Sequence, residues 1–195
     1  MRRTRGSVTG FSLVELVIVI ALILIALTVA VLGTRAAMAS ARVNSGVETV
    51  LSQLRLAHQE SMDRRMEYSV TFTLPGTIVT QRILQGQAPV AERTVTLPNE
   101  VQFIAPPGLP NPGPDGFGTG KFAIDFDQVN GGGGNVIFFV PDGTALDATG
   151  GPNNGVIYIG HARGLAPMHA ITMWGATSRF KVWNLANGKG GPKWN

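Results

Sequence analysis

The sequence predicts an α+β protein in which one long N-terminal helix packs on an antiparallel β-sheet head. Three observations support this prediction. A basic segment of ten residues precedes a long apolar run, and hydrophobic residues then recur at helical spacing to about residue 66. From there on, apolar and polar residues alternate with a period of two between breaks rich in glycine and proline, which is typical of strands joined by turns.

The composition fits one modest domain together with a membrane anchor. The chain has 195 residues, of which 44% are hydrophobic, enough for a single core. It contains no cysteine, which excludes disulfides, thiolate metal sites and thiol catalysis. The 16 basic residues exceed the 12 acidic ones, but three of the arginines lie among the first ten residues. Without that segment the chain is nearly neutral.

The N-terminal segments predict a leader followed by a transmembrane helix. Residues 1–10 carry three arginines and no acid, the pattern of a segment that stays in the cytoplasm. Residues 11–32 are apolar except for Ser12, Glu15 and Thr28, and as a helix they span about 33 Å, one bilayer core. We therefore expect a leader at 1–10, a transmembrane helix at 11–33 and a head at 34–195.

Two features of this region require an explanation. An ordinary secretory signal is cut after its apolar region, whereas the small residue here, Gly10, precedes it, so the apolar segment would survive processing. Glu15 is a charged group inside that segment, which is costly unless a partner neutralises it. No basic residue lies between Arg5 and Arg35, so a cation for Glu15 has to come from elsewhere.

The run Gly10-Phe11-Ser12-Leu13-Val14-Glu15-Leu16 resembles the start of the type IV pilin and type II secretion pseudopilin family. The resemblance implies a type IV pilin-like fold, cleavage between Gly10 and Phe11 by a prepilin peptidase, and N-methylation of Phe11. It also implies that Glu15 pairs with the N-terminal ammonium of a neighbouring subunit during filament assembly. The chain would then cross the bacterial inner membrane once, with its leader in the cytoplasm and its head in the periplasm.

The second half of the predicted helix, about residues 34–66, is amphipathic. No proline lies between Thr9 and Leu74, so we expect the anchor and this half to form one helix. Glu60 and Arg64 are spaced to form an i,i+4 ion pair. The apolar stripe consists of Val43, Val47, Val50, Leu54 and Ala57.

The remainder of the head is expected to be β-rich over 67–185. Residues 105–120 hold many prolines and glycines with almost no apolar periodicity, which indicates a long surface loop. Residues 141–144 read as a turn and 186–195 as a loose tail. The expected strands are 68–74, 77–85, 90–97, 121–127, 135–140, 155–161, 169–174 and 178–185.

A search for catalytic and metal-binding motifs finds none. The three histidines, His58, His161 and His169, belong to no HExxH pattern, and the chain has neither a Gly-x-Ser-x-Gly motif nor a complete phosphate-binding loop. The pairs Asp125/Asp127 and Asp142/Asp147 lack the ligand density of a calcium loop, and a turn-forming role is favoured for Asp142. We therefore predict a non-enzymatic protein without a cofactor or metal.

Charge is distributed unevenly in the head. Residues 100–154 contain six acids and one base, whereas residues 155–195 contain five bases and no acid. Bases interleaved with tryptophans suit nucleic-acid backbones and stacked bases, which makes DNA a candidate partner. The favoured alternative is that the basic strand packs against the acidic loop of the same head or a neighbour, or is solvated. The candidate nucleic-acid contacts are Arg163, Arg179, Lys181 and Lys189.

The C-terminal half carries a second resemblance. Phe138-Phe139-Val140-Pro141-Asp142-Gly143, the apolar segment 156–159, and Gly175 before a basic final strand are similar to the heads of H-type minor pseudopilins and FimT/FimU-type minor pilins, the GspH/FimT family. The resemblance implies a minor subunit of an inner-membrane filament that supports protein secretion by a type II system. The alternative is a type IV pilus minor pilin that acts in pilus assembly or DNA uptake. The expected partners are other pilin or pseudopilin subunits, the prepilin peptidase and the lipid bilayer.

Overall fold

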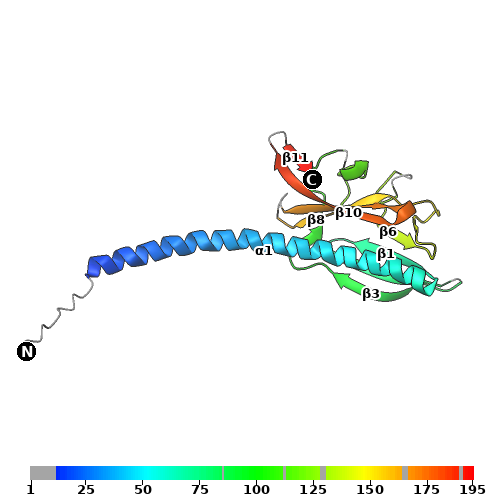
Figure 1. The fold of residues 1–195 in the computed structure, drawn as a ribbon, viewed down its shortest axis with the longest axis horizontal. Coiled ribbons are helices and arrows are strands. Elements are labelled where there is room, and N and C mark those ends of the chain that lie inside the picture. Colours follow the sequence, from blue (N-terminus) through cyan, green and yellow to red (C-terminus); the bar gives the residue numbers. More distant parts are fainter. Residues whose placement is uncertain (1–11, 85, 112, 128–130, 164–166, 189–190) are drawn as a thin grey trace, which may run out of the picture. The chain divides into compact units, whose positions relative to one another are not determined.

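The computed structural model describes residues 12–84, 86–111, 113–127, 131–163, 167–188 and 191–195, with the side chains of 29–36 and 187 excepted. The fold is α+β with antiparallel sheets, as predicted (Figure 1). By their contacts the residues form two compact units, Met1–Met38 and Ala39–Asn195, and we call the second unit the head. Helix α1 (Leu13–Arg64) begins in the first unit and ends in the second.

Two antiparallel sheets build the head. The first has the strand order β3-β2-β1-β6-β7 and consists of β1 (Glu67–Thr73), β2 (Thr77–Ile83), β3 (Val90–Thr96), β6 (Val136–Phe139) and β7 (Ala145–Leu146). The second has the order β11-β10-β9-β8-β4, with β5 also paired to β8. It consists of β4 (Val101–Phe103), β5 (Ile124–Asp125), β8 (Gly155–His161), β9 (Met168–Trp174), β10 (Arg179–Gly188) and β11 (Gly191–Trp194).

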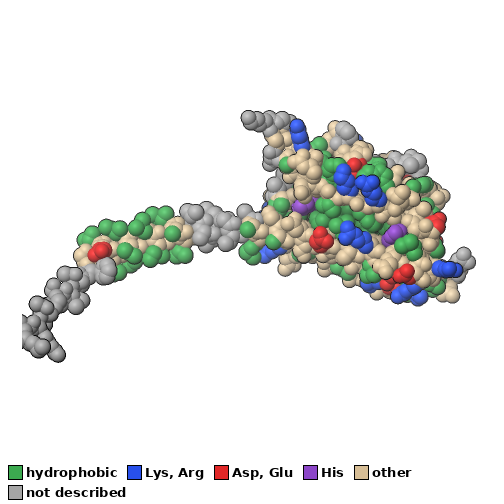
Figure 2. Space-filling view, in the orientation of Figure 1, with side chains coloured by type: hydrophobic (Ala, Val, Ile, Leu, Met, Phe, Trp, Pro, Cys, Tyr) green, Lys and Arg blue, Asp and Glu red, His purple; other side chains and the backbone are tan. Residues whose placement is uncertain are grey.

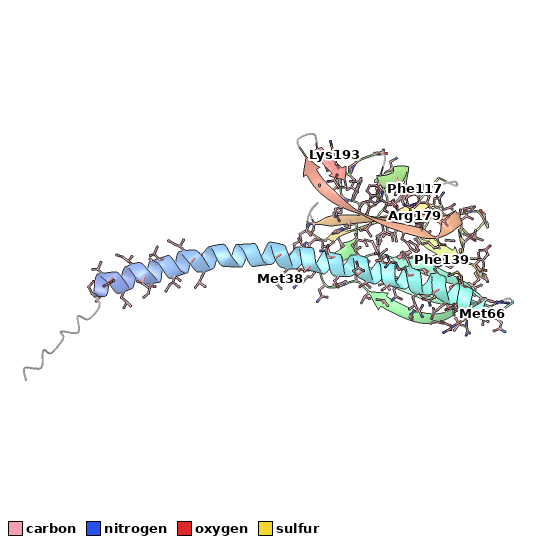
Figure 3. The ribbon with its side chains drawn as sticks, viewed as in Figure 1. Met38, Met66, Phe117, Phe139, Arg179 and Lys193 are labelled. Atoms are coloured by element: carbon pink, nitrogen blue, oxygen red, sulfur yellow. The ribbon has the colours of Figure 1, made fainter. Side chains whose placement is uncertain are left out.

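The main core lies where the head's part of α1 packs against both sheets. All five residues of the predicted apolar stripe are at most 4% exposed, which confirms that the stripe faces the core. It meets Tyr68, Val70 and Phe72 from β1 and Ile157 and Ile159 from β8. Side chains fill the space between this part of α1 and the strands (Figure 3). The stripe also contains Gly46, where a larger residue would not fit. A Cβ at this position would come 2.8 Å from Cγ1 of Val101.

A second core covers the other face of the second sheet. Every residue of β8 except His161 is buried, since alternate side chains contribute to the two cores. Val156 and Tyr158 lie in the second core, with Met168 and Ala170 of β9. The cover consists of the partly buried Ala105, Leu109, Phe117, Trp183, Leu185 and Trp194.

This second core corrects two sequence-based expectations. The proline-rich segment 105–120 is not merely a surface loop, because its few apolar side chains pack on the sheet. The expected loose tail, 186–195, instead continues β10 and returns as β11. Pro192 is tolerated in β11 because Asn187 and Pro192 form a pair flanked by hydrogen-bonded pairs, so the missing proline N–H points away from β10.

Candidate functional site

The N-terminal motif is described from Ser12 onward. The Ser12 side-chain oxygen accepts a hydrogen bond from the backbone N–H of Glu15 at 3.2 Å, so Ser12 caps α1. Glu15 therefore occupies the first turn, where a negative charge interacts favourably with the helix dipole. Gly10 and Phe11, the predicted cleavage site, lie outside the described residues.

The apolar side chains that follow Ser12 are exposed all round α1. Leu13, Val17 and Ile25 are between 56% and 78% exposed, and Thr28 satisfies its hydroxyl by donating to the Leu24 carbonyl at 2.8 Å. Figure 2 shows hydrophobic side chains on the visible face of this segment, with one acidic side chain near its start. Among the residues that the structure describes, no helix combines the length and the apolar character that a membrane crossing requires. The span predicted at 11–33 includes residues whose side chains the structure does not describe, namely residue 11 and residues 29–33.

The three candidate nucleic-acid residues that the structure describes do not form one cationic surface. Figure 2 shows basic and acidic side chains interspersed over the visible face of the head. Arg179 and Lys181 lie on β10, whereas Arg163 follows β8, and Lys189 is outside the described residues. Arg179 and Lys181 alternate along β10 and therefore lie on the same face of the strand.

Both cations of β10 already lie on aromatic rings. The Lys181 ammonium is 3.4 Å from the centroid of the Trp183 ring, and the Arg179 guanidinium is 5.4 Å from that of Trp174. Phe117 contacts Trp174 edge-on at 5.3 Å between centroids. These contacts occupy the indole surfaces on which a nucleic-acid base would have to stack.

Asp115, a residue that sequence reasoning did not single out, organises this face of β10. Its carboxylate accepts hydrogen bonds from the Thr172 hydroxyl at 2.6 Å and from Trp183 Nε1 at 3.1 Å. It also lies 3.8 Å from the Lys181 ammonium, and its side chain is only 15% exposed. The acidic loop of the head thus packs against the basic strand, as the favoured alternative in the sequence analysis anticipated. The Pro114-Asp115-Gly116 sequence signalled a turn but not this long-range contact.

Arg163 belongs to a separate cluster around Glu100. Its guanidinium lies 3.8 Å from the Glu100 carboxylate, which also pairs with Arg42 from α1 and lies 3.6 Å from His161 Nε2. The Arg163 side chain is 81% exposed, so this pair is weak and screened. The two regions that contain the candidate cations are therefore chemically different.

The three histidines occupy separate structural positions. His58 Nε2 lies 3.0 Å from the Gly143 carbonyl, and His161 faces Glu100. Burial lowers the pKa of His169, and this effect exceeds the opposite one of its hydrogen bond with Asn184. Within the described part of the chain, no three histidine or acidic side chains are grouped as metal ligands.

The aspartates of the turns serve as hydrogen-bond acceptors. Asp142 accepts from the N–H and the hydroxyl of Thr144 at 2.8 and 2.7 Å, so the turn-forming role expected for it is confirmed. Asp147 makes the same contacts with Thr149 and a further one with the N–H of Gly151 at 2.9 Å. These hydrogen bonds, the hydroxyl first, lower the pKa values of both carboxyls.

A charged cluster at the end of α1 was foreseen only in part. The expected Glu60–Arg64 pair is present at 3.7 Å. Glu60 also binds Arg93 of β3 through two hydrogen bonds, and Glu92 binds Arg82 and Arg64 at 3.3 and 3.4 Å. The cluster attaches the end of α1 to the edge of the first sheet.

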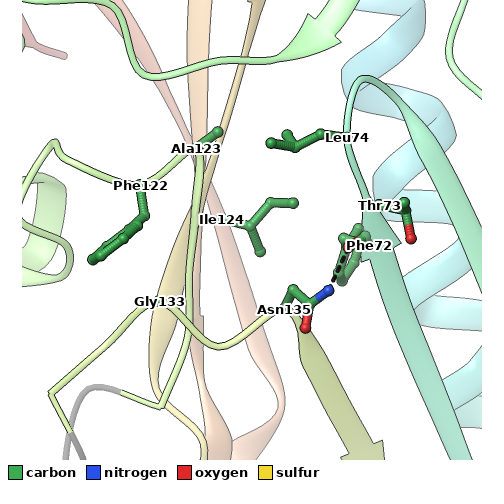
Figure 4. Close-up of a pocket in the computed structure, with 8 residues that line it drawn as sticks. All are labelled: Phe72, Thr73, Leu74, Phe122, Ala123, Ile124, Gly133 and Asn135. Carbon is green, nitrogen blue, oxygen red and sulfur yellow. Dashed lines mark hydrogen bonds between the residues drawn. The ribbon is translucent and has the colours of Figure 1, made fainter.

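The cavities of the head are shallow. One of about 390 Å³ lies at the junction of the two sheets, where Leu74 points toward Ala123 and Ile124 and the Asn135 amide donates to the Phe72 carbonyl at 2.9 Å (Figure 4). None of the described residues that line it is titratable, so they offer this cavity no acid–base chemistry.

Comparison with known proteins finds no matching family model, and neither a curated protein nor a solved structure matches the chain at a significant level.

Proposed function

We propose that this chain is a non-enzymatic minor pseudopilin or minor pilin with a pilin-like fold. It joins an inner-membrane filament that supports protein secretion by a type II secretion system. The observation that carries the proposal is the start of α1. A serine cap and a first-turn Glu15 directly follow the Gly10-Phe11 junction, so a cut there would leave a chain that is helical almost from its first residue.

The electrostatics of such a start favour assembly. Cleavage would create an ammonium group at Phe11, next to the positive end of the α1 dipole, and both charges favour a nearby carboxylate. Glu15 supplies that carboxylate on this chain. In a low-dielectric filament core an ammonium and a carboxylate offset each other's desolvation cost, so a neighbour is accepted only in the register that brings them together.

The structure of the head favours a role in assembly over catalysis. Among the described residues, Asp142 and Asp147 accept hydrogen bonds within turns, Glu60 and Glu92 pair with arginines of the first sheet, and most aromatic side chains pack in the two cores. Helix α1 buries one stripe in the head, and its other faces are available to neighbours.

The first test is processing. Gly10→Val should leave the leader attached, because a side chain at this position obstructs the approach of the peptidase to the backbone. Gly6→Val in the same leader is the matched control and should be processed normally. Intact mass of the membrane-extracted protein measures both outcomes, and a normally cut Gly10→Val chain would refute the proposal.

The second test is incorporation. Glu15→Gln should be processed and folded but should fail to crosslink to other filament subunits, whereas Thr28→Val, a polar-to-apolar change on the same helix, should crosslink normally. The chain has no cysteine of its own, so a single cysteine introduced at Leu16 reports neighbours specifically. Equal crosslinking of Glu15→Gln and the parent chain would refute the ammonium-pairing role.

A further inference from the structure

One edge of β10 is only half covered. On its inner side β10 pairs with β9 from Arg179 to Asn184. On its outer side β11 pairs only with Leu185–Gly188, and one further pair joins Asn184 to Asn195 through backbone hydrogen bonds of 2.8 and 2.9 Å. Within the described residues no backbone hydrogen bond reaches the outer edge of 179–183.

The alternation of an antiparallel strand identifies the free groups. Asn184 exchanges both of its backbone hydrogen bonds with Asn195, so its N–H and C=O point to the outer edge. Since this direction repeats every second residue, the N–H and C=O of Val182 and Phe180 also point outward, and those of Lys181 point to β9. The edge therefore presents two donors and two acceptors in the spacing of a strand.

The side chains beside this edge differ between its two faces. Val182 is 38% exposed, and Phe180 lies partly buried against Phe139 on the same face. The opposite face carries Arg179 and Lys181. Of these two cations, only Lys181 forms an ion pair with a carboxylate, that of Asp115, among the described residues. One face of the edge is thus apolar, and the other has an excess of positive charge.

We propose that this edge binds an extended segment of a partner protein whose side chains alternate between apolar and acidic. The segment would add an antiparallel strand beside β10, with its apolar side chains opposite Phe180 and Val182 and its acidic side chains beside Arg179 and Lys181. Charge complementarity selects an acidic segment over a basic one. The proposal does not depend on the filament role, because it uses neither Glu15 nor the N-terminal processing.

The proposal is tested with the full chain in detergent micelles and a blocked heptapeptide that alternates valine with aspartate. Titration calorimetry should show binding. Methylating the valine amide nitrogens should weaken it about tenfold or more, because those N–H groups face the Phe180 and Val182 carbonyls. Methylating the aspartate amides is the matched control, since those groups face away, and should change the affinity less than about twofold.

Variants of the chain test the same edge from the other side. Val182→Pro removes one outward donor without removing a hydrogen bond to β9, and should weaken binding about tenfold. Val182→Thr keeps the donor and should bind within about twofold of the parent. If circular dichroism shows that Val182→Pro is unfolded, the pair of methylated peptides decides.

Four results would overturn the proposal. These are the absence of peptide binding up to about 1 mM, equal binding of the two methylated peptides, unchanged affinity in a folded Val182→Pro variant, and equal binding of a peptide with lysine in place of aspartate.

Discussion

Glu60 on α1 binds Arg93 on β3 through two parallel hydrogen bonds, Nη1 to Oε1 at 2.9 Å and Nη2 to Oε2 at 2.6 Å. The two side chains are 15% and 26% exposed, so solvent screens this pair less than the other ion pairs of the head. The pair attaches the last turns of α1 to an edge strand whose own side chains are largely exposed.

Glu60→Gln is expected to lower the free energy of unfolding by about 2 kcal/mol, because one charge-assisted partner is lost and the Arg93 guanidinium remains partly buried. Glu48→Gln is the matched control. Glu48 is exposed on the same helix, and its change should stay within about 0.5 kcal/mol. Urea unfolding followed by circular dichroism measures both, and equal stabilities of the two variants would contradict the role given to the pair.

The same pair predicts a pH dependence of stability. The hydrogen bond from Arg93, together with the charges of Arg93 and Arg64, holds the pKa of Glu60 below its ordinary value of 4.5 in the folded chain. A lowered folded pKa contributes stability that is complete above the unfolded value and is lost as the pH falls through the folded one. The stability difference between the parent and Glu60→Gln should therefore be constant from pH 7 to about 5 and shrink below pH 4.5. A difference that grows on acidification would contradict the sign.

Two buried tyrosines are expected to respond oppositely to loss of their hydroxyls. Both are fully buried, but Tyr68 Oη accepts a hydrogen bond from Arg64 at 3.0 Å, whereas Tyr158 Oη has no hydrogen-bond partner in the described part of the chain. Burial, with the charge of Asp125, raises the pKa of Tyr158 to about 12, so this hydroxyl stays protonated.

Tyr68→Phe should therefore cost about 1 kcal/mol, and Tyr158→Phe should be neutral or stabilising, because it removes a buried polar group that is not hydrogen-bonded. Thermal melts of the two variants, each compared with the parent chain, give the result. A larger loss for Tyr158→Phe than for Tyr68→Phe would show that the Tyr158 hydroxyl has a partner.

Asp115 is expected to limit any affinity of β10 for nucleic acid. Asp115→Asn keeps a hydrogen-bond acceptor for Thr172 but removes the negative charge beside Lys181, so binding of duplex DNA at low salt should strengthen a few-fold. The gain should disappear at about 200 mM salt, because it comes from phosphate contacts alone. Fluorescence anisotropy with labelled DNA measures it, with Glu48→Gln, which removes an exposed carboxylate of α1, as the control. Tight, salt-resistant binding by the parent chain would instead favour a DNA-capture function.

The helix and most strands could be predicted because their signals are local. Val43, Val50 and Leu54 repeat at helical spacing, and β1 and β8 match the expected segments closely. The short strands β4 and β7 were missed, since a strand of two or three residues is too short for a period of two to be recognised.

The candidate sites, too, could be predicted where their contacts are local in sequence and not where they are long-range. Ser12 and Glu15 were identified from a contiguous motif, and the cap at the start of α1 is a local contact. Sequence reasoning favoured packing of the basic strand against an acidic loop over DNA, but it could not identify the acid, because Asp115 and Lys181 are separated by 66 residues whose path depends on tertiary packing.

The sequence by itself determined the order of elements, the apolar stripe of α1 and the charged N-terminal motif, because helix and strand periodicity and capping depend on residues within a few positions of one another. The tertiary structure alone decided that the second sheet has two covered faces, that residues 191–194 pair with β10, and that Asp115 meets Lys181. These contacts join segments that are remote in sequence, and each forms only once the burial of the two cores has brought its partners together.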